Sequence, residues 1–261
     1  MTSSLRDRVA LVTGGSRGVG AATVAALARA GAHVVVNYRN KTRRAEEVAE
    51  AARALGVRAL AVPADITDGV VVAAMVERVR AELGRLDVLV LNASGGMERE
   101  LVAADREYAM RINRDANLRL VELARPLMPP GGVIVHVTSH LAHFYGRIEQ
   151  PPVYEPVARS KHAGEAALGA LAPELAAAGL RLAIVSGDLI EDTIVPRLMD
   201  RQAPGLIERR RAQVGALPTT GEMADAIVRA AADASLPMGV VLFVGDANLL
   251  GARRGRPTRR S

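Results

Sequence analysis

The chain has 261 residues, 49% of them hydrophobic, which is enough for one large α/β domain with a buried core. It contains no cysteine, which excludes disulfides and cysteine-ligated metal sites and is consistent with a cytoplasmic protein. The net charge is +6, but the last ten residues alone hold five arginines, so the rest of the chain does not favour a nucleic-acid partner.

Short apolar runs alternate with amphipathic segments along the whole chain. The predicted strands lie near 9–13, 33–37, 59–63, 87–91, 132–138, 181–186 and 239–244. The predicted helices lie near 18–30, 42–55, 68–83, 104–127, 156–178 and 219–234. The strand runs lack polar alternation, as expected for strands buried on both faces of a parallel sheet. The pattern therefore predicts an α/β fold, a doubly wound, Rossmann-like parallel sheet of seven strands with helices on both faces.

The domain organisation follows from the absence of repeats, linkers and composition breaks before residue 250. Residues 1–250 are predicted to form a single domain, and 251–261 a basic, disordered tail. Residues 188–217 form a long excursion after a strand and are predicted to be a substrate lid. No apolar stretch approaches the ~20 residues of a membrane span, and the short polar start does not resemble a signal peptide.

A glycine-rich turn follows the first predicted strand. It reads Thr13-Gly14-Gly15-Ser16-Arg17-Gly18-Val19-Gly20. Glycines let the backbone approach a pyrophosphate, and the next helix offers its unpaired N–H groups to that anion. The turn predicts a dinucleotide site, although its G-x3-G-x-G spacing is not the G-x-G-x-x-G of many dehydrogenases. The candidate binding residues here are Gly14, Ser16, Arg17, Gly18, Val19 and Gly20.

The end of the second predicted strand indicates which dinucleotide binds. A cofactor with a free 2′-hydroxyl is usually held by an acid at this point. Here Arg39 stands at the strand end without an acid, and Arg17 lies inside the glycine turn. Two guanidinium groups suit a 2′-phosphate, which they grip through charge-assisted hydrogen bonds. We therefore expect NADP(H) as the cofactor rather than NAD(H).

These residues and several later ones resemble the short-chain dehydrogenase/reductase family over about residues 5–246. Thr13, Gly14, Gly18 and Gly20 match the family's T-G-x3-G-x-G turn. The resemblance assigns further cofactor contacts to Asp65, Ile66, Asn92, Ala93 and Thr193. It implies that Asn113 belongs to a proton relay, that Ser139 orients the substrate, and that Lys161 holds the nicotinamide ribose.

The family's Tyr-x3-Lys signature does not occur at this helix of the sequence. Val157 stands four residues before Lys161, and the nearest tyrosine is Tyr154, which gives Tyr-x6-Lys, a spacing like that of enoyl-carrier-protein reductases. Seven residues of continuous helix return to nearly the same face about 10.5 Å along the axis. With Pro156 at the first helical position and Glu155 as the cap, we expect Lys161 to point at Tyr154. The ammonium group is then expected to lower the phenol's pKa, so that Tyr154 protonates the alkoxide.

Alternatives to this assignment come from the same region. Tyr154 could pack as a hydrophobic staple at the helix start, and Tyr145, His140 or Ser160 could donate the proton instead. His140 and His143 resemble a metal pair, but no third ligand is evident and no metal site is predicted. The run Arg209-Arg210-Arg211 is interpreted as a solvated helix face.

The sequence thus predicts an NADPH-dependent oxidoreductase that transfers hydride to a carbonyl or quinone-like group of an apolar small molecule, for example an aromatic polyketide by family analogy. The predicted lid offers apolar side chains to such a substrate: Leu189, Ile190, Ile194, Val195, Leu198, Met199, Leu206 and Ile207. Two alternatives remain, an enoyl (C=C) reductase and a non-catalytic NADPH-binding sensor or scaffold. The resemblance also implies a homodimer or homotetramer joined through the helices near 104–127 and 156–178.

Overall fold

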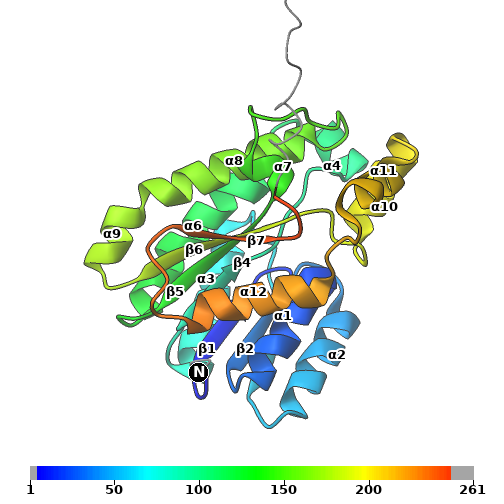
Figure 1. Cartoon of the computed structure of the whole chain (residues 1–261). Helices are drawn as coiled ribbons and strands as arrows, with labels where there is room; N and C mark the ends of the chain where they lie inside the picture. The colour runs from blue at the N-terminus through cyan, green and yellow to red at the C-terminus, as the bar shows by residue number, and fades with distance from the viewer. Residues whose placement is uncertain (1–4, 248–261) are drawn as a thin grey trace, which may run out of the picture.

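Strands without polar alternation form a fully parallel sheet in the computed structural model, which describes residues 5–247 (Figure 1). The sheet order is β3-β2-β1-β4-β5-β6-β7. The strands are β1 (Val9–Val12), β2 (His33–Tyr38), β3 (Ala59–Pro63), β4 (Val88–Leu91), β5 (Val133–Ser139), β6 (Arg181–Gly187) and β7 (Val240–Val244). The order turns back at β1, and there the carboxyl ends of β1 and β4 open a crevice for ligands. The predicted doubly wound, seven-stranded sheet is confirmed.

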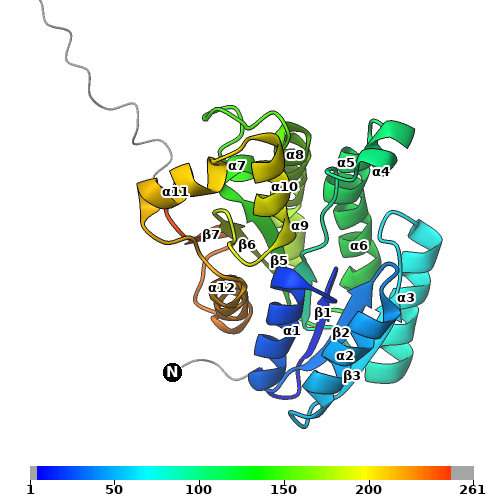
Figure 2. The same cartoon turned by 90° about the vertical axis from the view of Figure 1, so that its right-hand side faces the viewer.

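Helices cover both faces of this sheet (Figures 1 and 2). The long ones are α1 (Gly18–Arg29), α2 (Thr42–Arg53), α3 (Gly69–Leu83), α6 (Ala116–Ala124), α8 (Glu155–Ala170) and α12 (Thr220–Ala232). Within residues 5–247, every helix is too short or too polar to traverse a lipid bilayer.

Side chains of each strand alternate between two apolar cores. In β1, Ala10 and Val12 pack with α1, α2 and α12, whereas Val9 and Leu11 pack with α3, α6 and α8. Because both faces are buried, each strand position is apolar, which explains the continuous runs in the sequence.

Two predicted helices are interrupted in the structure. The segment predicted as 104–127 starts at the last residue of α4 (Arg99–Ala104) and contains α5 (Tyr108–Met110), a π-helical turn (Arg111–Asp115), α6 and a short 3-10 helix (Arg125–Leu127). The segment predicted as 156–178 ends at Ala170 and resumes as α9 (Ala172–Ala177), because Pro173 in the first turn of α9 cannot donate the N–H that would continue α8.

The predicted lid, 188–217, is itself helical. It contains α10 (Ile194–Gln202) and α11 (Leu206–Val214), which lie over the carboxyl ends of the strands (Figure 2). Gly205 separates them with a φ of +80°, a conformation that glycine adopts without strain. A short helix, α7 (His140–His143), follows β5 directly. The predicted basic tail, 251–261, lies outside the described residues.

Candidate active site

Hydrogen bonds connect the glycine turn to both neighbouring strands, and the Gly15 N–H donates to Asn37 O of β2 at 2.8 Å. Thr13 Oγ1 accepts hydrogen bonds from the backbone N–H groups of Asn92 and Ala93 at 2.9 and 3.0 Å. The Asn92 amide donates to Thr13 O at 2.8 Å. A Cβ on Gly20 would lie 2.2 Å from Gly14 O, so only glycine permits this approach of helix and turn. Gly14 and Gly18 have φ values of +63° and +52°.

A basic groove of about 590 Å³ runs from this turn past the end of β2. It is lined by all the residues predicted to bind the dinucleotide except Lys161: Gly14, Ser16, Arg17, Gly18, Val19, Gly20, Arg39, Asp65, Ile66, Asn92, Ala93 and Thr193. Asn40, Lys41 and Arg44 also line it and were not predicted. The lining thus contains four exposed cations, Arg17, Arg39, Lys41 and Arg44, against the three carboxylates of Asp65, Glu98 and Asp192. The cations fit a dinucleotide with an added phosphate on its ribose.

Arg39 is positioned by a residue far away in sequence. Its Nη1 donates to the hydroxyl of Tyr108 at 2.8 Å. Tyr108 is 6% exposed, and burial raises the pKa of its phenol, with the charge of Glu98 adding to that shift. Sequence reasoning missed Tyr108, because no local pattern connects it to Arg39.

Two predicted catalytic hydroxyls meet at the carboxyl end of β5. The Tyr154 hydroxyl donates to Ser139 Oγ at 3.1 Å. Ser139 Oγ also accepts from the N–H of Ala142 at 3.2 Å and so caps α7. Because both bonds use Ser139 as acceptor, its own O–H is available to a ligand. The structure thus brings these two side chains together.

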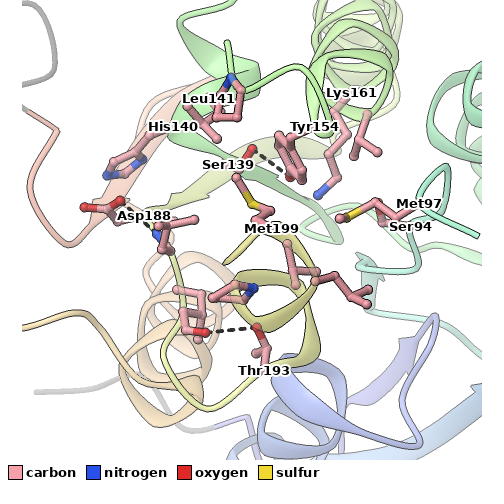
Figure 3. Close-up of a pocket in the computed structure, with 18 of the residues that line it drawn as sticks. Ser94, Met97, Ser139, His140, Leu141, Tyr154, Lys161, Asp188, Thr193 and Met199 are labelled. Atoms are coloured by element: carbon pink, nitrogen blue, oxygen red, sulfur yellow. Dashed lines mark hydrogen bonds between the residues drawn. The ribbon is translucent and has the colours of Figure 1, made fainter. Parts of the chain in front are cut away.

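The side chain of Lys161 extends from α8 toward the Tyr154 hydroxyl. Figure 3 shows its amine beside the Tyr154 ring, on the side opposite Ser139. Tyr154 is the N-cap of α8 and Glu155 its first residue, so the predicted cap at Glu155 is wrong by one position. The helix is continuous from Glu155 through Lys161, and seven residues therefore bring the two side chains to one face.

Burial shifts the pKa values of both groups. It raises the pKa of the Tyr154 phenol above 10.0, and only the hydrogen bond with Ser139 opposes that shift. The expectation that Lys161 lowers this pKa is therefore wrong, since desolvation of the phenolate dominates. The same burial lowers the pKa of Lys161 from 10.5 to about 8, opposed by the charge of Glu165. At neutral pH the pair is a protonated phenol and an ammonium group close to its pKa.

Asn113 fixes α8 to the loop after β4. Its amide donates to Gly95 O and to Ser160 Oγ, both at 2.9 Å. It lies in the π-helical turn, a feature frequent at functional sites. The carbonyl of Asn113 accepts from the Asn117 amide at 2.9 Å.

The alternative proton donors are placed differently. The Tyr145 hydroxyl donates to Glu155 at 2.6 Å, and Tyr145 does not line the cavity beside Ser139. Ser160 is buried against Asn113. His140 lines the cavity, but burial lowers its pKa to about 4, and its Nδ1 is bonded to Ser186 Oγ at 2.9 Å. Tyr154 has the best geometry of the four.

A cavity of about 980 Å³ lies over Ser139, Tyr154 and Lys161 and shares Arg17, Val19 and Thr193 with the basic groove. Seven of the eight apolar lid residues named from the sequence line it: Leu189, Ile190, Ile194, Val195, Leu198, Met199 and Leu206. Ile207 does not. Thr193 lies at the junction, where its Oγ1 donates to Ile190 O at 2.9 Å (Figure 3).

The arginine run of the lid is not a uniformly solvated face, which corrects that interpretation. Arg210 donates to Asp188 Oδ2 from its Nη2 at 2.6 Å and from its Nε at 3.0 Å. The side chains of Arg210 and Asp188 are only 13% and 6% exposed. Arg211 pairs with Glu191 near the surface. The Asp188–Arg210 pair connects α11 to the end of β6 at the edge of the cavity, which both residues line.

Solved structures of known proteins share this architecture. A short-chain dehydrogenase from Burkholderia cenocepacia in complex with NADP superposes with a TM-score of 0.81 and 30% identity, covering 94% of this chain and 99% of that one. The promiscuous reductase LugOII, which catalyses keto-reduction at C1 during lugdunomycin biosynthesis, gives a TM-score of 0.74 and 26% identity, covering 95% and 100%.

Sequence comparisons agree. Hydroxynaphthalene reductase arp2 of Aspergillus fumigatus is 36% identical over 140 residues, which is 52% of this chain and 50% of that protein. The 1-cyclohexenylcarbonyl-CoA reductase of Streptomyces collinus is 34% identical over 195 residues, 71% of this chain and 66% of that protein. The chain thus spans about half to two thirds of the length of these two relatives. The family model of the short chain dehydrogenases matches residues 8–201. The chain therefore belongs to the short-chain dehydrogenase/reductase family of NAD(P)-dependent oxidoreductases.

Proposed function

We propose that this protein is an NADPH-dependent reductase that delivers hydride to the carbonyl carbon of an apolar small molecule, with Tyr154 as the proton donor. The observation that carries the proposal is the Tyr154–Ser139 hydroxyl pair, 3.1 Å apart, at the base of a cavity of about 980 Å³. The cavity is lined by apolar lid side chains and joins the basic groove, so a substrate carbonyl and a dinucleotide can meet beside the pair.

NADP(H) is the cofactor that fits the groove. The glycine turn would hold its pyrophosphate, and Arg17, Arg39, Lys41 and Arg44 would surround its 2′-phosphate. When bound, NADPH supplies the hydride. The related structure in complex with NADP supports this choice.

The chain's own residues supply the proton and the electrostatic stabilisation. The free O–H of Ser139 donates to the substrate oxygen and stabilises the negative charge that develops there. The protonated phenol of Tyr154 turns from Ser139 to the same oxygen and gives up its proton as the alcohol forms. The Lys161 ammonium stabilises the resulting phenolate and can return a proton to it, since its pKa of about 8 is close to working pH.

The substrate class follows from the cavity lining. Methionine and aliphatic side chains such as Met97, Leu141, Val157 and Met199 surround the space. Such a lining favours a flat or bulky apolar ketone, for example an aromatic polyketide. The names of the relatives, a hydroxynaphthalene reductase and a reductase acting by keto-reduction, support this class.

Reduction of an activated C=C bond is the second candidate. The Tyr-x6-Lys spacing and the similarity to a 1-cyclohexenylcarbonyl-CoA reductase favour it. In that reaction Tyr154 stabilises an enolate oxygen rather than protonating an alkoxide. Family membership and the assembled hydroxyl pair favour either reaction over a non-catalytic sensor.

A substrate panel tests the proposal. NADPH consumption is followed with an aromatic ketone such as 1-tetralone, a quinone and an enoyl thioester, and the products are identified by mass spectrometry. Alcohol formation from the ketone or quinone is expected. Exclusive saturation of the enoyl thioester would support the second candidate, and tight NADPH binding without turnover on any class would support a sensor.

We also propose self-association. Residues of α8 and α9 that face away from the sheet are small or polar, including the exposed Ala166 and Ala170, and permit close approach of a second copy. Sedimentation equilibrium would test for a dimer or tetramer.

A further inference from the structure

The catalytic lysine has no hydrogen-bonded partner within residues 5–247, although its ammonium group must exchange a proton in every turnover of the proposed reaction. Asn113, to which the family resemblance assigns the relay, has its amide engaged by Gly95 and Ser160 and its carbonyl by Asn117. The structure offers another carboxylate, Glu165, one helical turn after Lys161 on α8.

The Glu165 carboxylate is largely buried and has only one of its two oxygens hydrogen-bonded within the described residues. Its side chain is 13% exposed, and its Oε1 lies 2.6 Å from Nδ1 of His143. Its Oε2 is buried and has no hydrogen-bond partner among the described residues. Residues at i and i+4 of a helix have Cβ atoms about 5–6 Å apart. The two side chains form no ion pair in the structure, but the Glu165 charge raises the pKa of Lys161, so the carboxylate lies close enough to act on the ammonium group.

His143 connects this carboxylate to solvent. It lies on α7, its side chain is 19% exposed, and its ring is fixed edge-on against Phe144 and Phe243 at 4.9 and 5.2 Å. The three side chains therefore form a series from the buried ammonium, through a carboxylate with one open oxygen, to an imidazole at the surface.

We propose that His143 and Glu165 form a relay that returns protons from solvent to Lys161. The inference rests on the proposed function. In each turnover the substrate alkoxide takes the Tyr154 proton, and the phenolate takes one from Lys161. The lysine amine then takes one through Glu165 from the His143 imidazolium, which water reprotonates. These proton transfers consume one solvent proton and change no oxidation state; the hydride transfer from NADPH to the carbonyl is the separate redox step. Glu165 and His143 line neither the cavity nor the groove, so they act through Lys161 and are positioning residues.

Other charged groups around the relay do not replace it. His136, on β5 beneath α8, is fully buried, and its pKa is lowered to about 3 by burial and by the Lys161 charge, so it stays neutral. Tyr154 stays protonated at neutral pH. Burial lowers the pKa of His140, on the same short helix as His143, to about 4; the charges of Asp188 and Asp246 oppose this shift, and that of Arg210 adds to it.

Lys161 can be observed directly, because the chain contains two lysines only, Lys41 and Lys161. NMR of protein labelled with ε-¹³C-lysine therefore gives two signals, and the exposed Lys41 serves as an internal reference. Glu165→Gln is expected to lower the Lys161 pKa by about one unit, since it removes the one charge that opposes desolvation. This readout needs no substrate, so it fails independently of the proposed function.

Turnover provides the second readout. Glu165→Gln is expected to shift the alkaline limb of the kcat–pH profile down by the same amount and to lower kcat about fivefold at pH 8, with NADPH affinity within twofold of wild type. His143→Asn should lower kcat severalfold and be rescued by imidazole buffer. His162→Asn is the matched control, because His162 also bridges α8 to α7 but bonds the Ala142 carbonyl at 3.0 Å.

The proposal is overturned by an unchanged Lys161 pKa in Glu165→Gln. It is also overturned if Glu165→Gln and His143→Asn both keep the wild-type kcat–pH profile. A third contrary result is a His143→Asn variant that has a lower thermal midpoint and is not rescued by imidazole, because the His143–Glu165 pair would then be purely structural.

Discussion

Tyr154 and Ser139 share a hydrogen bond of 3.1 Å, although one residue begins a helix and the other ends a strand. The bond places both hydroxyls at the base of the cavity. The loop between them contains Pro151 and Pro152, and the turn there is closed by the Tyr154 N–H donating to Pro151 O at 2.8 Å. The position of the phenol is therefore set by the loop as well as by the helix.

Ser139→Ala is expected to lower kcat about 100-fold, since loss of one preorganised donor to a developing oxyanion typically costs that much. It also removes the cap of α7, which costs about 1 kcal/mol of stability. Ser139→Thr keeps the hydroxyl and separates the two effects. Steady-state kinetics and thermal unfolding of both variants measure them; equal kcat in Ser139→Ala and wild type would remove Ser139 from the chemistry.

Arg39→Ala is expected to weaken NADPH binding about 10- to 100-fold and to leave NADH binding unchanged, because a hydrogen-bonded charge pair with the 2′-phosphate is lost. Tyr108→Phe removes the partner that holds Arg39 and should weaken NADPH binding severalfold. Titration calorimetry with both cofactors measures this.

The control for this series is Arg43→Ala. Arg43 carries the same charge nearby, but its side chain is 92% exposed, pairs with Glu47 and does not line the groove. A loss of NADPH affinity equal to that of Arg39→Ala would mean that only net charge matters.

The buried ammonium of Lys161 makes stability depend on pH. Its pKa falls from 10.5 in the unfolded chain to about 8 in the folded one, so between these values the unfolded chain binds more protons. The cost of burying the charge is complete below pH 8 and disappears as pH rises through that window. Relative to Lys161→Met, wild type should gain on the order of 2–3 kcal/mol between pH 8 and 10.5. Urea unfolding at both pH values tests this, and a parallel pH dependence in the two proteins would argue against it.

Asp188→Asn is expected to detach α11 from the end of β6, because it leaves the Arg210 charge without its bidentate partner. Breaking a buried ion pair costs about 3–5 kcal/mol, and substrate KM should rise while NADPH affinity stays within twofold. Glu191→Gln, which removes the charge of the exposed partner of Arg211, should change neither stability nor the substrate KM. Kinetics and thermal midpoints measured on both variants would settle whether the buried pair holds the lid.

The fold could be predicted because its signals are local. Apolar runs, glycine turns and helical periodicity each occupy a few consecutive residues, and they give the order of strands and helices. The break at Arg111–Asp115 could not be predicted in this way, since Asn113 is fixed there by Gly95 and by Ser160, 47 residues away. Propensity alone favours one continuous helix.

In the candidate site, too, residues close in sequence could be predicted, whereas contacts between distant residues could not. Lys41 and Arg44 follow Arg39 within one basic run, so their presence in the groove was readable from the sequence. Tyr108 was not, because 69 residues separate it from Arg39. The direction of the Tyr154 pKa shift depends on how completely the ring is buried, and burial is a property of the folded chain.

The most direct test of the account compares Tyr154→Phe with Tyr145→Phe, whose hydroxyl bonds Glu155 outside the cavity. Both are assayed for NADPH oxidation with the best substrate and for NADPH affinity. We expect Tyr154→Phe to lose about 100-fold or more in kcat while binding NADPH normally, and Tyr145→Phe to match wild type. Full turnover by Tyr154→Phe would show that another group donates the proton and would contradict the assignment.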